Sequence, residues 1–138
     1  MRLELTRRGD YAVRVMLALA RDAGADWLSV PTVSAAMSIP ERFLPRVMVD
    51  LVDAGLVVGH RGRTGGYRLA RPAEGISLLE IITAAESEPD ERLCILRGGP
   101  CDVDGRCAVH EAFGGARDAM LERLGATSLE EVARAGDR

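Results

Sequence analysis

Three cysteines lie close together in the second half of this 138-residue chain, and their side chains are the ones best suited to chemistry. Cys94, Cys101 and Cys107 are separated by six and then five residues, and His110 follows shortly after. Glycine, proline and charged residues fill the intervals, which is typical of a loop. Thiolates and an imidazole on one loop can bind a transition metal or undergo redox chemistry, whereas an odd number of cysteines argues against a disulfide framework.

This ligand set is compatible with three kinds of site. Three thiolates can hold three corners of a 4Fe–4S cluster or three positions of a 2Fe–2S cluster, which leaves one position for a different ligand. Three cysteines and a histidine can also form a structural zinc site, although zinc modules usually have cysteines in closely spaced pairs. The third alternative is a thiol switch without a cofactor, in which oxidation forms a disulfide.

The rest of the sequence predicts the elements that must position this loop. Apolar spacing predicts a helix from about Ala12 to Asp22, a short helix over 31–37 and, after a turn, a further helix that ends near Ala54. Two short strands are expected at 56–58 and 67–69, joined by a glycine-rich hairpin tip. A capping box at Ser77–Glu80 opens a helix to about residue 85. A long helix over roughly 108–124 and a short helix after residue 127 complete the chain.

This order of elements predicts a mainly α fold with a small β wing, namely a winged helix-turn-helix domain followed by a long helix. In such a domain the second helix of the motif enters the major groove, so Arg42 and Arg46 are the candidates for contacts with bases. Arg61 and Arg63 at the hairpin tip are placed to contact phosphates or a minor groove. Pro45 lies inside the predicted recognition helix, so that helix starts later or has an irregular first turn.

The charge distribution agrees with a division of labour along the chain. All 18 basic residues are arginine, and the net charge is −3. Residues 1–76 hold 11 arginines against 8 acidic residues, whereas residues 77–138 hold 7 against 13. We therefore predict a DNA-binding region over 1–76 and a sensor and dimerisation region over 77–138, with double-stranded DNA meeting the basic half.

Several classes of protein are disfavoured. The chain lacks an apolar run near the roughly 18 residues of a membrane helix and lacks the features of a signal peptide at its start, so we expect a cytoplasmic protein with no membrane partner. An enzyme is not expected, because a Cys107–His110 pair would lack oxyanion donors, a phosphate loop and a metal–water motif. A winged-helix adaptor that binds proteins would not need arginines on both the helix and the wing.

Two segments carry a resemblance to a known family. The run from Ala54 to Val57 and the wing sequence from Arg61 to Ala70 resemble the wing signature of IscR/NsrR-type bacterial regulators, the Rrf2 family. The start of the chain, Met1–Leu3 and Gly9–Arg14, is similar to the start of that family. The resemblance implies a homodimeric winged-helix transcription factor, expected to be a repressor, whose long helix forms the dimer contact. Pro45 replaces a polar residue often used to contact DNA, so the target sequence cannot be copied from a relative.

The resemblance also implies an iron–sulfur cluster on Cys94, Cys101 and Cys107, which responds to nitric oxide, redox or iron status. Family members with a histidine at the place of His110 resemble the 2Fe–2S type. Asp10 is at the place where nitric-oxide-sensing members supply a carboxylate from the partner subunit to a 4Fe–4S cluster. The chain has both residues, and we favour Asp10 with a 4Fe–4S cluster over His110 with a 2Fe–2S cluster.

Overall fold

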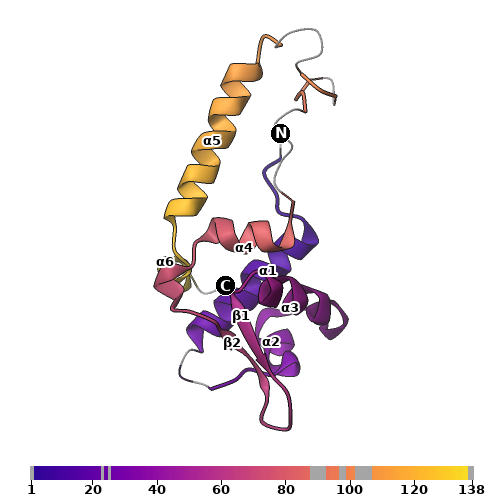
Figure 1. Ribbon diagram of the computed structural model, residues 1–138, viewed down its shortest axis with the longest axis vertical. Coiled ribbons are helices and arrows are strands. Elements are labelled where there is room, and N and C mark those ends of the chain that lie inside the picture. Colours follow the sequence, from indigo (N-terminus) through magenta and orange to yellow (C-terminus); the bar gives the residue numbers. More distant parts are fainter. Residues whose placement is uncertain are drawn as a thin grey trace.

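A computed structural model shows a helical body with one two-stranded antiparallel sheet at its edge, and it describes residues 2–22, 24, 26–87, 93–96, 99–101 and 107–136 (Figure 1). The fold class predicted from the sequence is thereby confirmed. In chain order the elements are α1 (Arg7–Arg21), α2 (Val30–Met37), η1 (Glu41–Phe43), α3 (Leu44–Asp53), β1 (Val57–His60), β2 (Gly66–Leu69), η2 (Ala73–Gly75), α4 (Leu78–Ala85), α5 (His110–Ala126) and α6 (Leu129–Ala135).

The first three helices begin at side-chain caps or at a proline. Thr6 caps α1 by accepting a hydrogen bond from the backbone N–H of Gly9, and Ser29 caps α2 in the same way. Such caps satisfy N–H groups that the first turn of a helix leaves without a partner. The core between these helices consists of fully buried side chains, among them Val15, Met16 and Val33.

Pro45 sets the start of the recognition helix. The chain leaves α2 through Ser38, which has a φ of 54°, and forms the single 3₁₀ turn η1 before α3 begins at Leu44. Pro45 therefore occupies the first turn of α3, where its missing N–H costs no intrahelical bond. The later start that the sequence suggested is confirmed. As a consequence Arg42 lies on the 3₁₀ turn, whereas Arg46 lies on the first turn of α3.

The wing is the hairpin of β1 and β2, which pair antiparallel with Val57 opposite Leu69 and His60 opposite Gly66. Its base is joined to the segment before α2, because Leu28 and Tyr67 exchange two backbone hydrogen bonds of 2.9 and 2.8 Å. Gly66 makes this junction possible. It has a φ of 155°, and a Cβ at this position would lie 2.3 Å from the carbonyl oxygen of Leu28.

Helices from both halves of the chain share one core. The buried residues Ile76, Ile81 and Leu129 belong to the same cluster as those of the first three helices, and α4 and α6 both pack on α1. The predicted capping box is confirmed at the start of α4. The backbone N–H of Ser77 and the side chain of Arg71 hold the pKa of Glu80 below its usual value, because both stabilise the carboxylate. The functional division at residue 76 stays a prediction.

Helix α5 stands apart from this core. None of its residues is buried, and in Figure 1 it extends away from the body, on the side opposite the wing, towards the described parts of the cysteine loop. Its 17 residues give it a length of about 25 Å. Phe113 on this helix is 39% exposed, so part of its ring meets solvent in the single chain. None of the described helices is both long and apolar enough to cross a membrane.

Candidate functional site

The structure brings the three cysteines together. Their sulfur atoms all lie within 4.8 Å of one another, with Cys94 and Cys101 buried and Cys107 partly buried. Among the residues that the structure describes, neither His110 nor Asp10 places a ligand atom in this group. The structure thus brings together the three cysteines that the sequence predicted as ligands. Among the described residues of one chain, neither predicted fourth ligand joins them.

Backbone hydrogen bonds hold the cysteines in place. Leu93 and Pro100 form an isolated β-bridge, and the N–H of Cys94 donates to the carbonyl of Gly99 at 2.5 Å. The N–H of Cys107 points at the sulfur of Cys101, 3.4 Å away. The carbonyl of Cys107 in turn accepts from the N–H of His110 at 3.0 Å, so the third cysteine is tied to the start of α5.

The three thiols form a donor set that favours a cation. The pKa of Cys107 is raised above its usual value. The largest cause is the hydrogen bond with Cys101, and the second is desolvation. A thiolate is the form that binds metal, so a metal bound here displaces thiol protons and offsets the repulsion between neighbouring thiolates. The close grouping of three sulfur ligands is what makes this site chemically suited to a metal or cluster.

Asp10 lies on the first turn of α1 and lines a surface groove together with Arg7 and Ser38. Its carboxylate is 41% exposed and pairs with Arg14, at 2.9 Å for the ion pair and 3.0 Å for the hydrogen bond from Nε. Arg14 also donates to the carbonyl of Met37 at 3.3 Å. Asp10 is thus accessible from outside the chain and is oriented by a guanidinium that is itself fixed to α2.

Glu86 connects the segment before the cysteine loop to the start of α1. Its Oε1 accepts two hydrogen bonds of 2.6 Å from Thr6, one from the backbone N–H and one from the hydroxyl. Gly9 leaves room for this contact, since a Cβ at that position would lie 2.0 Å from Glu86 Oε1. The side chain that precedes the loop is therefore in direct contact with the helix that carries Asp10.

The proposed recognition surface is occupied by arginines with defined partners. Arg46 is 70% exposed, and its Nε lies 3.6 Å from the carboxylate of Asp50 one turn later. The guanidinium of Arg42 stacks over the ring of Phe43 at 4.8 Å, and the rings of Phe43 and Tyr11 are 5.6 Å apart. Phe43 was missed as a support for Arg42, whereas the i,i+4 spacing of Arg46 and Asp50 on one helix is readable in the sequence.

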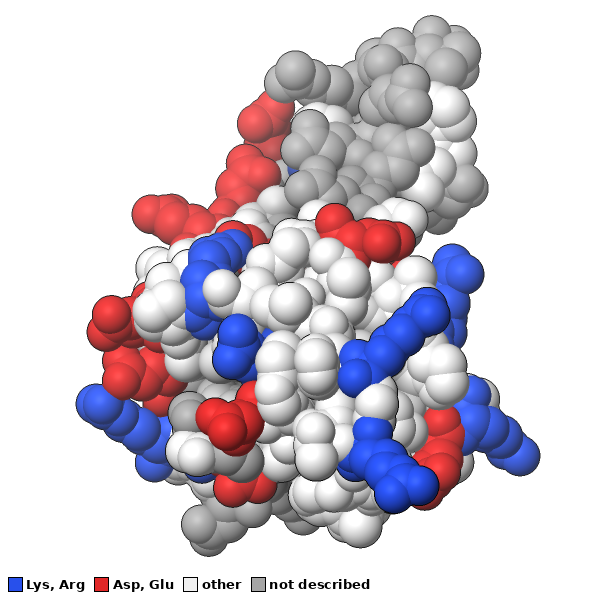
Figure 2. Space-filling model, turned by 60° about the horizontal axis from the view of Figure 1, so that its bottom comes forward, with Lys and Arg blue, Asp and Glu red and all other residues white. Residues whose placement is uncertain are grey.

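Arg61 and Arg63 are both exposed at the wing tip, as predicted. The lower end of the molecule, which the wing reaches in Figure 1, is shown from below in Figure 2. Arginine side chains project from several parts of this face around an uncharged middle, with acidic side chains interspersed. The face is thus mixed in charge, with arginines as its projecting groups.

A stack of three side chains supports the wing and was also missed at the level of sequence. The rings of Trp27 and His60 are 5.0 Å apart and inclined by 25°, and the guanidinium of Arg68 lies 4.3 Å from the Trp27 ring. Since His60 belongs to β1 and Arg68 to β2, one indole contacts both strands of the hairpin. A lone tryptophan before α2 carried no signal of this role, because the contact joins segments far apart in sequence.

Replacing Trp27 with alanine is expected to lower the free energy of unfolding by about 1–2 kcal/mol, because the aromatic stack and the cation–π contact are both lost. Urea unfolding followed by circular dichroism measures this, since Trp27 is the only tryptophan and fluorescence would vanish with it. A phenylalanine at this position keeps an aromatic face and should recover most of the loss. Equal urea midpoints for the alanine variant and the wild type would show that the stack contributes no stability.

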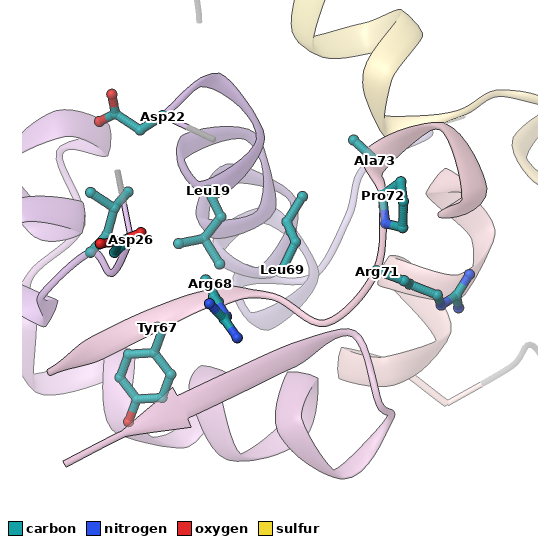
Figure 3. Close-up of a pocket in the computed structure, with 10 residues that line it drawn as sticks. Leu19, Asp22, Asp26, Tyr67, Arg68, Leu69, Arg71, Pro72 and Ala73 are labelled. Carbon is teal, nitrogen blue, oxygen red and sulfur yellow. The ribbon is translucent and has the colours of Figure 1, made fainter. Parts of the chain in front are cut away.

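A surface pocket lies between the wing and the end of α1 (Figure 3). Leu19 and Leu69 form apolar parts of its lining, while Asp22 and Asp26 lie on the opposite side from Arg71. Arg71 is engaged with Glu80 and with the carbonyl of Gly75. The charged groups are therefore divided between two signs and do not converge on one ligand chemistry.

Comparisons with known proteins agree with this geometry. The Rrf2 family, described as iron-dependent transcriptional regulators, matches residues 5–135. The chain is 32% identical over 130 residues to an HTH-type transcriptional regulator of Neisseria meningitidis, with 94% of this chain and 87% of the relative covered. It is 31% identical over 132 residues to the HTH-type transcriptional regulator IscR of Xenorhabdus nematophila, with 96% and 80% covered.

A solved structure extends the likeness to three dimensions. CymR of Bacillus subtilis, called the global cysteine regulator of that organism, superposes with a TM-score of 0.83 at 29% identity. The superposition covers 99% of this chain and 100% of the other. Both halves of the present fold are therefore found together in that regulator.

Proposed function

We propose that this chain, which belongs to the Rrf2 family of transcriptional regulators, binds operator DNA as a homodimer and responds to nitric oxide, redox or iron status through an iron–sulfur cluster. The observation that carries the proposal is the gathering of Cys94, Cys101 and Cys107, whose sulfur atoms lie within 4.8 Å of one another at the end of the longest helix. The family description as iron-dependent supports iron as the metal.

In this proposal the three cysteines hold three positions of the cluster, and a 4Fe–4S cluster is favoured over a 2Fe–2S cluster. Bound iron supplies a site that reacts with small oxidants or nitric oxide, or that is lost when iron is scarce. Asp10 of the partner subunit is the favoured fourth ligand, because it is exposed on an open groove and oriented by Arg14. His110 is the alternative, because it begins the helix that follows Cys107 directly.

The exposure of helix α5 is an argument for the proposed homodimer. An isolated helix of 17 residues is marginally stable in water, and here none of its residues is buried by the rest of the chain. Packing α5 against a second copy would cover Phe113 and supply the missing contacts. A two-fold dimer also places two recognition helices at the spacing of successive major grooves, as helix-turn-helix proteins require.

DNA contacts are assigned to Arg42 and Arg46 near the start of α3 and to Arg61 and Arg63 on the wing. The described contacts suggest how the state of the loop reaches them. Glu86 joins the segment before the loop to Thr6, which caps the first turn of α1, where Asp10 lies, so a change in the loop shifts the start of α1. Because α1 packs on α3, such a shift changes the relative position of the two recognition helices.

An ultraviolet–visible spectrum of protein purified without oxygen, with iron and sulfide assayed on the same sample, tests the cofactor. About four irons per chain and a broad band near 400 nm support a 4Fe–4S cluster, and about two irons with structured bands support a 2Fe–2S cluster. A colourless protein with zinc or with no metal contradicts the cluster. Equal affinity of the cluster-loaded and cluster-free protein for the same duplex contradicts the sensing role.

One observation favours a second candidate for the loop, a single metal ion such as zinc. Two sulfurs bound to one tetrahedral zinc at 2.3 Å lie about 3.8 Å apart. The observed sulfur separations are all within 4.8 Å, which is compatible with three sulfurs around one ion. A structural zinc would leave the DNA-binding proposal unchanged and would be recognised by zinc without sulfide in the assay above.

A further inference from the structure

The carboxylate of Asp50 lies between two arginines from different helices. Its Oδ1 is 3.6 Å from Nε of Arg46, and its Oδ2 is in contact with a terminal nitrogen of Arg8 on α1. Only 11% of the Asp50 side chain is exposed, whereas the exposed fractions of Arg8 and Arg46 are 48% and 70%. Asp50 is thus a covered acid that holds two projecting cations on the proposed DNA-binding face.

The contact with Asp50 leaves one end of Arg46 available. A guanidinium has five donors in a planar fork, and Nε is its atom in ion-pair contact with Asp50, at 3.6 Å. The terminal amino groups are at the outer end of a side chain that is 70% exposed. Those two groups can donate together to N7 and O6 of one guanine, which is the commonest specific contact of arginine in the major groove.

We propose that Asp50 is a positioning residue that fixes the plane of the Arg46 guanidinium and thereby determines specificity for a guanine in each half-site. The inference rests on the proposed function and goes further by naming the base and the residue that orients its reader. Arg46 alone has a long flexible side chain, so an unrestrained guanidinium would contact phosphates and bases without choosing between them.

Arg8 has a secondary part in this arrangement. By contacting the second oxygen of Asp50, it keeps the carboxylate from rotating away from Arg46. Both arginines keep large exposed fractions, so their charges are screened by solvent and the expected effect of these contacts is on orientation rather than on folding. Asp53, an exposed acid on the same helix, provides a matched control.

The experiment uses the full-length dimer and duplexes that the wild type selects from a randomised library. Each base pair of the selected site is then replaced in turn, and affinity is measured for wild type, Asp50→Ala, Asp50→Asn and Asp53→Ala. We expect the wild type to prefer guanine at one position of each half-site by about tenfold. In Asp50→Ala this preference should fall below about threefold at that position alone, with the dependence on salt unchanged, since phosphate contacts remain.

The variants distinguish a change in the orientation of Arg46 from a defect in folding and from a failure of the proposed function. Asp50→Asn keeps an oxygen acceptor for Arg46 and should retain part of the preference, while Asp53→Ala should match the wild type. Arg46→Lys should lose the preference at the same position, because lysine lacks the planar fork. The proposal is overturned if Asp50→Ala keeps the wild-type base preference at every position. It is also overturned if Asp50→Ala loses affinity equally at every position. A wild type that selects no sequence contradicts the proposed function itself.

Discussion

Replacing Arg46 and Arg61 together with alanine is expected to abolish retention of operator DNA, with a loss of affinity of about 100-fold or more. A good bidentate contact to a base contributes about 1–3 kcal/mol, and a wing arginine adds charge neutralisation at the backbone. The two residues lie on separate elements, α3 and the tip between β1 and β2. Their loss therefore removes one contact from each of the two DNA-binding elements.

The measurement is binding of a fluorescent duplex selected by the wild type, repeated over a range of salt concentrations. The double variant should also show a smaller slope of log affinity against log salt, because fewer phosphates are neutralised. Arg123→Ala combined with Arg134→Ala removes the same charge from α5 and α6 and should bind normally. Unchanged DNA binding by the Arg46/Arg61 variant would contradict the assignment of DNA contacts to these two arginines, whereas a wild type that retains no DNA would favour a winged-helix adaptor that binds proteins.

Replacing Cys101 with serine is expected to remove the metal or cluster completely. Cys101 is buried and lies between the other two ligands in sequence, and its sulfur faces the N–H of Cys107 at 3.4 Å. A serine hydroxyl stays protonated at neutral pH and is a poor ligand for iron or zinc, which prefer thiolates here. Iron, sulfide and zinc assays on protein purified without oxygen should then all fall to background.

Two milder variants identify the fourth ligand in the same assay. Asp10→Ala should weaken retention of a 4Fe–4S cluster and leave the protein folded, whereas His110→Ala should matter only for a 2Fe–2S cluster. Glu111→Ala, next to His110 on the same turn of α5, provides a control for the helix start. Full retention of iron and sulfide by the Cys101 variant would contradict assignment of the cysteine trio as the metal site.

Local patterns in the sequence predicted the main elements of the fold, although α1 begins at Arg7 rather than near Ala12 and the 3₁₀ turns η1 and η2 were not predicted. The apolar periodicity of α1 and α3, the Ser77–Glu80 capping box and the glycine-rich wing are features of neighbouring residues, and each is confirmed in the structure. The place of Pro45 was also predictable from local sequence, because its ring and missing N–H confine it to the first turn of a helix. The family resemblance rested on the wing and the start of the chain, and the match over residues 5–135 confirms it.

The tertiary structure alone decided which side chains support the functional ones. Asp50 meets Arg8 from another helix, Trp27 meets both strands of the wing, and Glu86 meets Thr6 across 80 positions of sequence. These contacts depend on how helices pack, and periodicity within one segment carries no information about them. The sequence by itself thus determined the winged-helix elements and the three thiols. Only the folded loop brought their sulfurs within 4.8 Å, and only the packing of α1 on α3 added Arg8 to the carboxylate beside Arg46, because side chains acquire such neighbours when the core forms.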